Sequence, residues 1–401
     1  MVYIALPVLN ESESISQFLR TLKSQNEMDF FLVVCVNQYD HWWEDEKYFP
    51  WCEDNLRSLQ ILNNEKEIPL KIIDKSSLGQ GWLPKKGGVG HARKVIMDWI
   101  SEHANEDDII LSVDADTFYP ADYISTLKKF FAENKSSWGV SLPYYHQLTG
   151  DQEQDNLILR YEIYMRTFLL NMFRIENPYA FTALGSAMAF PVWAYRKAGG
   201  LTPVLSGEDF YFLQKLVKYG SIDSYVTTTA FPSSRLSDRV VFGTGPALIK
   251  GSQGDWSSYP IYDPQFFDEV GKTFQLFPEL YEKDIPTPMD DFLKKQFRTT
   301  NLWGSFRENY KDRDNFVKAC RNKVDGLRIL QYLRQRQIEE HVQNEQALKK
   351  CLELENLYPE NKRCMIEILE NGLQSSSVEC FQTIRNSLFR KEMTKRVQWH
   401  N

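Results

Sequence analysis

Short apolar runs alternate with amphipathic segments along the first part of the chain. Four of these runs resemble buried strands, and they cover residues 2–8, 30–36, 70–74 and 108–113. Between them, residues 12–22 and 91–103 carry apolar side chains at helical spacing. Strands that alternate with helices predict a mostly parallel central sheet flanked by helices, which is the α/β class.

The rest of the pattern is less regular. Residues 41–64, rich in tryptophan and acidic residues, show no clear period and are predicted to form a long loop. Further elements are expected as a long helix at 151–178, a strand at 182–190, a short helix at 193–198 and a long helical stretch at 327–357. Pro286 and Pro288 mark the expected join between an α/β domain, residues 1–285, and a helical C-terminal extension, residues 286–401.

Polar side chains stand where these strands end, namely Asn37, Asp74, Asp114 and Asp116. Side chains two positions apart on a strand point the same way, so the last two carboxylates should converge. Their mutual repulsion would be relieved by a divalent cation that completes its shell with water and phosphate oxygens. Each residue alone could equally be a helix cap or a turn former. Together, at one edge of a sheet, they favour a nucleotide site that holds Mg²⁺ or Mn²⁺.

Two further segments carry candidate chemistry. Residues 85–93 read Lys-Lys-Gly-Gly-Val-Gly-His-Ala-Arg, where glycines, a helix start and the cations Lys86 and Arg93 suit a phosphate, unless the segment is only a flexible loop. Residues 233–245 contain Arg235, Arg239 and a Gly-Thr-Gly sequence, which could close over the diphosphate as a lid, with the arginines binding phosphate oxygens, or belong to an ordinary surface turn. Glu208 and Asp209 open an amphipathic helix, where acids also suit the helix dipole.

Taken together, the order of these motifs resembles family 2 glycosyltransferases of the GT-A fold over roughly residues 1–240. The resemblance rests on Ile-Ala-Leu-Pro-Val-Leu-Asn-Glu at 4–11, Ala92-Arg93, Asp114-Ala115-Asp116, Gly185 with Gly199-Gly200, and Gly207-Glu208-Asp209. It implies that Asp114 and Asp116 reach Mg²⁺ or Mn²⁺ on a diphosphate. It further implies that Asp209 and Glu208 are catalytic, Asp209 as the base and Glu208 as a contact to the acceptor or to the metal shell. It also implies a nucleotide-sugar site formed by Pro7, Glu11, Asn37, Asp74, Lys86, Arg93, Asp114, Gly185 and Arg239, although Asn37 replaces the usual acid.

The implied activity is transfer of a sugar from a nucleotide-diphosphate donor to a saccharide, lipid-linked or small-molecule acceptor, with inversion. A retaining enzyme of the mannosylglycerate-synthase type remains an alternative. A sugar nucleotidyltransferase is disfavoured, because Leu9-Asn10-Glu11-Ser12 stands where such enzymes carry a glycine-rich loop. A non-catalytic nucleotide-sugar-binding protein is the third possibility. The absence of a Gln-x-x-Arg-Trp motif and of apolar runs of membrane-spanning length argues against a polymer-extruding synthase.

Composition and charge change this picture little. The net charge is −7, divided into −12 over residues 1–285 and +5 over residues 286–401. The basic C-terminal part could lie on an anionic membrane surface or be an ordinary solvated face, and no nucleic-acid partner is expected. Six scattered cysteines without a Cys-x-x-Cys pair indicate neither zinc nor disulfides. With no signal peptide recognised, a cytoplasmic location is expected, with peripheral attachment to the inner membrane face left open.

Overall fold

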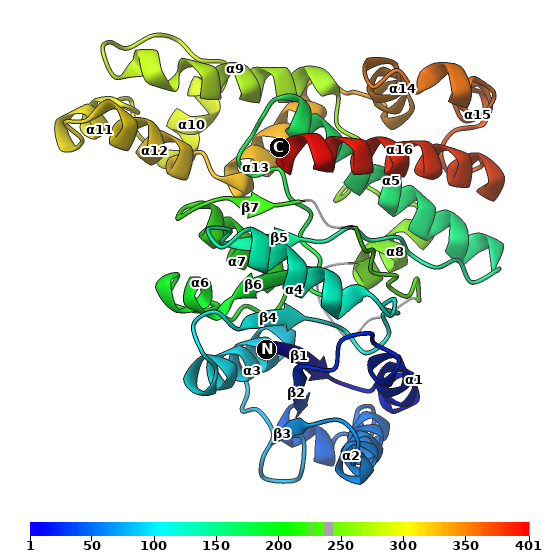
Figure 1. Cartoon of the computed structure of the whole chain (residues 1–401). Coiled ribbons are helices and arrows are strands. Elements are labelled where there is room, and N and C mark those ends of the chain that lie inside the picture. The colour runs from blue at the N-terminus through cyan, green and yellow to red at the C-terminus, as the bar shows by residue number, and fades with distance from the viewer. Residues whose placement is uncertain (225–226, 236–243, 401) are drawn as a thin grey trace. The chain divides into compact units, whose positions relative to one another are not determined.

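A computed structural model describes residues 1–224, 227–235 and 244–400, which belong to two compact units (Figure 1). The first unit consists of Met1–Ile158, Phe181–Gln253 and Arg396–Asn401, and the second of Leu159–Ala180 and Gly254–Lys395. The join predicted between residues 285 and 286 therefore lies inside the second unit.

The first unit is built on one central sheet. Its strands are β1 Val2–Val8, β2 Phe30–Asn37, β3 Leu70–Lys75, β4 Ile109–Ser112, β5 Gly139–Ser141, β6 Met188–Pro191 and β7 Ile222–Asp223. They lie in the order β3-β2-β1-β4-β6-β5-β7, and of these strands only β6 runs against the others. The predicted α/β fold with a mostly parallel sheet is confirmed.

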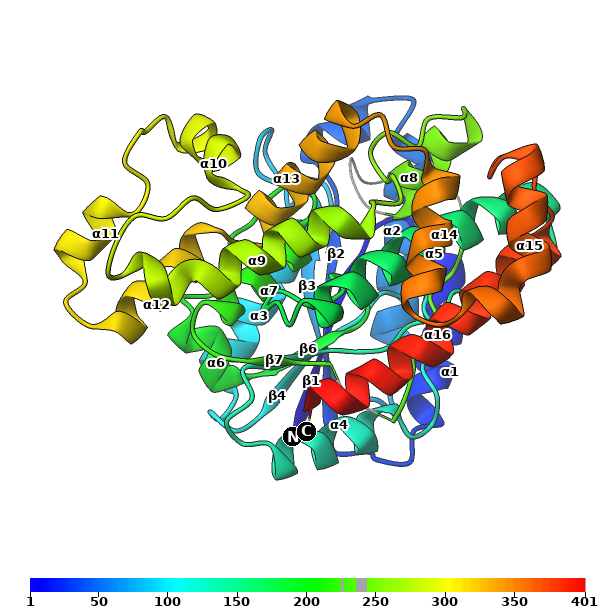
Figure 2. The same cartoon turned by 90° about the horizontal axis from the view of Figure 1, so that it is seen from above.

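Helices cover both faces of the parallel part of the sheet, which explains why β1 and β2 are almost wholly apolar. Helix α3, Val89–His103, packs on β1 and β2, while α1, Ser12–Lys23, packs on α2, Phe49–Asn64. Figures 1 and 2 show α3 on one side of these strands and the α1–α2 pair on the other. The first unit also contains α4 Tyr123–Glu133, α6 Val192–Lys197, α7 Glu208–Val217 and α8 Thr244–Ser252.

The predicted loop over residues 41–64 is wrong. The chain there forms a 3₁₀ helix, η1 Asp40–Glu44, and then α2. The buried face of α2 mixes Leu59 and Leu62 with Asp54 and Asn55, so its apolar period is obscured. Each of these buried polar residues is hydrogen-bonded, because Asp54 accepts from the Ser12 amide at 3.0 Å and the Asn55 side chain donates to Gln38 at 2.8 Å.

The predicted strand at 182–190 is also shorter than expected, since only Met188–Pro191 pairs as β6. The preceding residues, including Gly185, are irregular, and their backbone carries contacts to side chains instead of a neighbouring strand. This irregular segment ends beside β4 at the centre of the sheet.

In the described part of the second unit, the regular elements are all helices, and the predicted helical C-terminal region is confirmed. They are α9 Pro264–Leu280, α10 Asp290–Phe297, α11 Gly304–Asn309, α12 Arg313–Lys323, α13 Gly326–Glu339, α14 Asn344–Leu354 and α15 Tyr358–Asn371, with most of α5 Gln152–Arg174 and α16 Val378–His400. The single stretch predicted at 327–357 is divided, because His341 adopts a left-handed φ of 50° between α13 and α14. No helix in the described ranges is both long and apolar enough to cross a membrane.

Within the second unit, α5 and α16 are joined by buried charges. Arg166 contacts Glu162 at 3.0 Å and Glu392 at 2.5 Å, and Arg385 lies 3.8 Å from Glu162. These four side chains are at most 1% exposed. Removing one member of such a network leaves a partner charged and buried, which is strongly destabilising.

We therefore expect Glu392→Ala to lower the free energy of unfolding by roughly 3–5 kcal/mol. Urea denaturation of the full-length protein measures this loss. Glu379→Ala, at an exposed position of the same helix, is the matched control and should cost less than about 1 kcal/mol. Equal effects of the two substitutions would show that the buried network contributes little.

Candidate functional site

The candidate site lies where the strand order reverses. The chain leaves β1 toward β2 on one side, while β4 pairs with β1 on the other, so a crevice is expected beyond the carboxyl ends of β1 and β4. Glu11 follows β1, and Asp114 and Asp116 follow β4. Three of the predicted carboxylates thus flank the position where open α/β sheets bind ligands.

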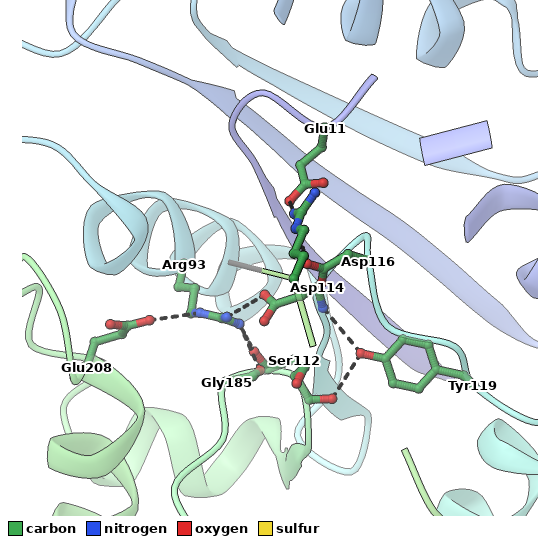
Figure 3. A network of polar contacts seen from close by, with 10 residues as sticks. Glu11, Arg93, Ser112, Asp114, Asp116, Tyr119, Gly185 and Glu208 are labelled. Atoms are coloured by element: carbon green, nitrogen blue, oxygen red, sulfur yellow. Dashed lines mark hydrogen bonds and ion pairs between the residues drawn. The ribbon is translucent and has the colours of Figure 1, made fainter. Parts of the chain in front are cut away.

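Arg93 of α3 lies at the centre of this site, with 3% of its side chain exposed (Figure 3). Its Nη2 donates to Asp114 at 2.6 Å and its Nε to Glu208 at 2.9 Å. Its Nη1 donates to the Gly185 carbonyl at 2.9 Å and to the Ser112 hydroxyl. One guanidinium therefore holds the end of β4, the segment before β6 and the start of α7.

Glycine is required at position 185 for this arrangement. A Cβ there would overlap the guanidinium of Arg93, so any other residue would displace it. A close approach also occurs at Gly90, where a Cβ would overlap the carbonyl of Val204. Together these two glycines allow the start of α3 to pack against the backbone of the segments that precede β6 and α7.

Tyr119 is a site residue that the sequence did not reveal. Its hydroxyl accepts from the Asp114 amide at 3.2 Å and donates to the Ser186 carbonyl at 2.9 Å (Figure 3). The side chain is buried and fixes the turn after β4 to the segment that contains Gly185. No spacing rule links a tyrosine to a carboxylate five residues earlier, so only the structure identifies it.

Asp116 and Glu11 share a second arginine. Nη2 of Arg235 lies 2.8 Å from Oδ2 of Asp116 and also donates to Oε1 of Glu11. The Arg235 side chain is 35% exposed, far more than that of Arg93. The two carboxylates of the Asp-x-Asp motif are therefore each paired with a different arginine.

Glu208 and Asp209 begin α7 after Gly207, whose φ of 80° favours glycine. Glu208 is buried against Arg93, whereas Asp209 is half-buried and accepts from the Phe210 amide at 2.7 Å. Burial raises the pKa of Glu208, and the charge of Asp209 adds to this effect, while Arg93 acts in the opposite direction. Burial likewise raises the pKa of Asp209. At both carboxyl groups, the effect of burial on the pKa outweighs the opposing effect of the Arg93 charge.

Two predicted nucleotide contacts are already engaged within the protein. The Asn37 side chain donates to the Val8 carbonyl at 2.9 Å and accepts from the Trp82 indole at 3.1 Å. Asp74 accepts from the backbone and hydroxyl groups of Ser76 and Ser77, at 2.5–3.0 Å. Desolvation raises the pKa of Asp74, but these hydrogen bonds outweigh it and leave the pKa lowered.

The other predicted residues lie apart from this network. Pro7 is buried within β1 and pairs in register with Cys35 of β2. Lys86 is exposed in the loop before α3. Arg239 lies outside the described residues. The structure thus brings together Glu11, Arg93, Asp114, Asp116, Gly185, Glu208 and Asp209.

The carboxylates fit a hard divalent cation that is shared with a ligand. Asp114 and Asp116 offer oxygen donors, and Mg²⁺ in nucleotide enzymes is commonly held by one or two carboxylates plus phosphates and water. Within the described ranges, no group of three or more His, Cys, Asp or Glu side chains is placed to hold a metal ion by itself. A cation at this position would therefore need oxygen atoms from a diphosphate or from water.

No protein-family model matches this chain, and no curated protein matches its sequence. Among solved structures it is similar to TarS 1–349 from S. aureus, with a TM-score of 0.36 and 14% identity, over 96% of this chain and 90% of that one. It is also similar to the mannosyltransferase PcManGT from Pyrobaculum calidifontis in complex with GDP-Man and Mn²⁺. That TM-score is 0.41 with 12% identity, over 99% of this chain and 86% of the other. Likeness this distant decides neither reaction nor substrate.

The role of Arg93 gives a prediction about stability and pH. In Arg93→Met the buried Glu208 loses its cation, so we expect the free energy of unfolding at pH 8 to fall by roughly 3–5 kcal/mol. The raised pKa of Glu208 should rise further in this variant. A carboxyl group with a folded pKa above its unfolded value of about 4.3 binds more protons when folded, so stability increases as pH falls through that window.

The stability deficit of Arg93→Met should therefore shrink between pH 8 and pH 5. Urea denaturation of both proteins at the two pH values measures it. In the matched double variant, Arg93→Met with Glu208→Gln, the change in deficit between the two pH values should be smaller. A deficit in Arg93→Met that is the same at both pH values would contradict this role of Glu208.

Proposed function

We propose that this protein is a GT-A type glycosyltransferase that moves a sugar from a nucleotide-diphosphate donor to an acceptor hydroxyl, with inversion. One observation carries the proposal: the buried Arg93 pairs both with Asp114 at the strand reversal and with Glu208 at the start of α7, and Asp116 and Asp209 follow these two acids closely in the chain. The reaction needs carboxylates that hold a cation on the departing diphosphate and a separate carboxylate that takes the proton of the acceptor hydroxyl. Asp114 with Asp116 can serve the first purpose, and Asp209 can serve the second.

The donor side follows from the first pair. Asp114 and Asp116 would hold Mg²⁺ or Mn²⁺, which supplies Lewis-acid stabilisation of the leaving diphosphate when it is bound. Arg93 and Tyr119 keep Asp114 in place from behind, because both are buried and contact its carboxylate and its amide. Such preorganisation means that little rearrangement is needed when negative charge develops on the leaving group.

The acceptor side follows from the second pair. Glu208 is held by Arg93 and is assigned a positioning role at the start of α7. Asp209 is more exposed and is assigned as the base that takes the proton of the acceptor hydroxyl at a carboxylate oxygen. Its raised pKa brings it nearer to neutral pH, where a general base works best. The proposed acceptor hydroxyl belongs to a saccharide, to a lipid-linked acceptor or to a small molecule.

Transfer or hydrolysis with a panel of UDP-, GDP- and CMP-linked sugars in the presence of Mn²⁺ tests the proposal. We expect turnover of at least one donor, its loss with EDTA, and an inverted anomeric centre in the product by NMR. Asp209→Asn should reduce kcat by about 10²–10⁴-fold, because the general base is lost. Asp107→Asn, an exposed position at the other end of β4, is the matched control and should retain full activity.

If no donor is turned over and no nucleoside diphosphate binds with Mn²⁺ by calorimetry, the protein is not a transferase of this type. Release of pyrophosphate from a nucleoside triphosphate and a sugar phosphate would identify a nucleotidyltransferase instead. A retained anomeric configuration would replace the inverting mechanism.

The pKa of Asp209 predicts the pH dependence of the reaction. A base acts only when deprotonated, so kcat/KM should fall as pH drops through the pKa of Asp209 in the free enzyme. Because burial raises this pKa, the acid limb should lie above the ordinary aspartate value of about 3.9. Steady-state rates from pH 4 to pH 9 measure the limb. An acid limb centred at or below the ordinary value would contradict the assignment of Asp209.

A further inference from the structure

Arg235 is held at the site in a different way from Arg93. Arg93 uses all three of its nitrogens as donors. Arg235 uses the single nitrogen Nη2 for both Glu11 and Asp116. Its Nε is buried and has no partner within the part of the chain that the structure describes. Arg235 therefore retains donors that its present contacts do not use.

The backbone at Ser234, just before Arg235, is held by hydrogen bonds. A change of partner at Arg235 would therefore involve its side chain more than this part of the backbone. Ser234 is buried, and its hydroxyl donates to the Gln147 carbonyl at 2.7 Å. The Ser234 carbonyl accepts from the Gln154 side chain at 2.8 Å. From this fixed point, the Arg235 side chain reaches Glu11 and Asp116 on the two sides of the strand reversal.

Arg235 occupies the position of a counterion. Glu11 is buried, and two carboxylates that face one region repel each other unless a cation lies between them. The Nη2 atom supplies that positive charge at 2.8 Å from Oδ2 of Asp116. A divalent cation bound by Asp116 would compete with Arg235 for the same carboxylate. The guanidinium, once released, is suited to bind phosphate oxygens with its unused donors.

On these grounds, and resting on the proposed function, we infer that Arg235 and the divalent cation compete for Asp116, and that the displaced Arg235 then binds the donor diphosphate. The arginine makes binding of the bare cation weaker and binding of the cation with the diphosphate stronger. Arg235 thus makes the site select the complete metal–nucleotide complex over the free metal ion. Arg93, which is buried with every nitrogen engaged, stays in place on Asp114 throughout.

The two effects have opposite signs, and one substitution separates them. Arg235→Met removes the competing positive charge, so the affinity for Mn²⁺ alone should increase by about tenfold. An adjacent arginine lowers the pKa of an aspartate by about 1–3 units, and tenfold corresponds to the lower end of that range. The affinity for UDP or GDP at saturating Mn²⁺ should decrease by about tenfold, because a charge-assisted contact to phosphate is lost. Electron paramagnetic resonance measures free Mn²⁺, and calorimetry measures nucleotide binding.

Arg20→Met is the matched control, since it removes the same charge from an exposed position of α1 and should change neither affinity. Arg235→Lys keeps a positive charge without the guanidinium fork, so its Mn²⁺ affinity should stay near that of the wild type. Thermal denaturation without ligand checks that each variant folds.

An unchanged or weaker affinity of Arg235→Met for Mn²⁺ overturns the competition. An unchanged affinity for the nucleotide overturns the contact with the diphosphate. Both results differ from failure of the proposed function, in which the wild-type protein binds neither UDP nor GDP in the presence of Mn²⁺.

Discussion

The buried guanidinium of Arg93 is the interaction on which the site depends. Removing an arginine from water is unfavourable unless charged and polar acceptors surround it. Here the acceptors come from β4, from the turn after it, from the segment before β6 and from α7. Gly185 has to lack a side chain so that the guanidinium fits. One desolvated cation thus fixes the spacing between the Asp-x-Asp motif and the carboxylates of α7.

The buried position of Arg93 gives the acidic residues of the site two different environments. Glu208 and Asp114 are paired with a cation that is almost inaccessible to water, so they are held in place. Asp209 is next to Glu208 but outside that ion pair, and Asp116 is paired with a partly exposed arginine. Asp114 and Glu208 are therefore fixed to the scaffold by Arg93, whereas Asp116 and Asp209 lie outside the ion pairs of Arg93.

The sequence predicted the parts of this arrangement that depend on local periodicity. The four parallel strands follow from apolar runs. The two-residue repeat of a strand does not apply to Asp114 and Asp116, because β4 ends at Ser112 and both residues lie beyond it, each paired with a different arginine. Helix α2 was missed because hydrogen-bonded polar residues share its buried face. Arg93 was expected to face a phosphate, but its partner Glu208 is 115 residues away, and no local pattern encodes such a contact.

Asn37 and Asp74 show why polar strand ends are not equivalent. Both stand where a nucleotide is expected, and the sequence offers no means of telling whether their hydrogen-bonding capacity is already in use. In the structure Asn37 links β1 to Trp82, and Asp74 closes the turn that follows β3. A ligand that recruited either residue would have to replace contacts that hold the protein together. A cation at Asp116 would compete with Nη2 of Arg235, and Nε of that side chain has no partner within the described residues, so the displaced arginine has a donor with which to make a new contact.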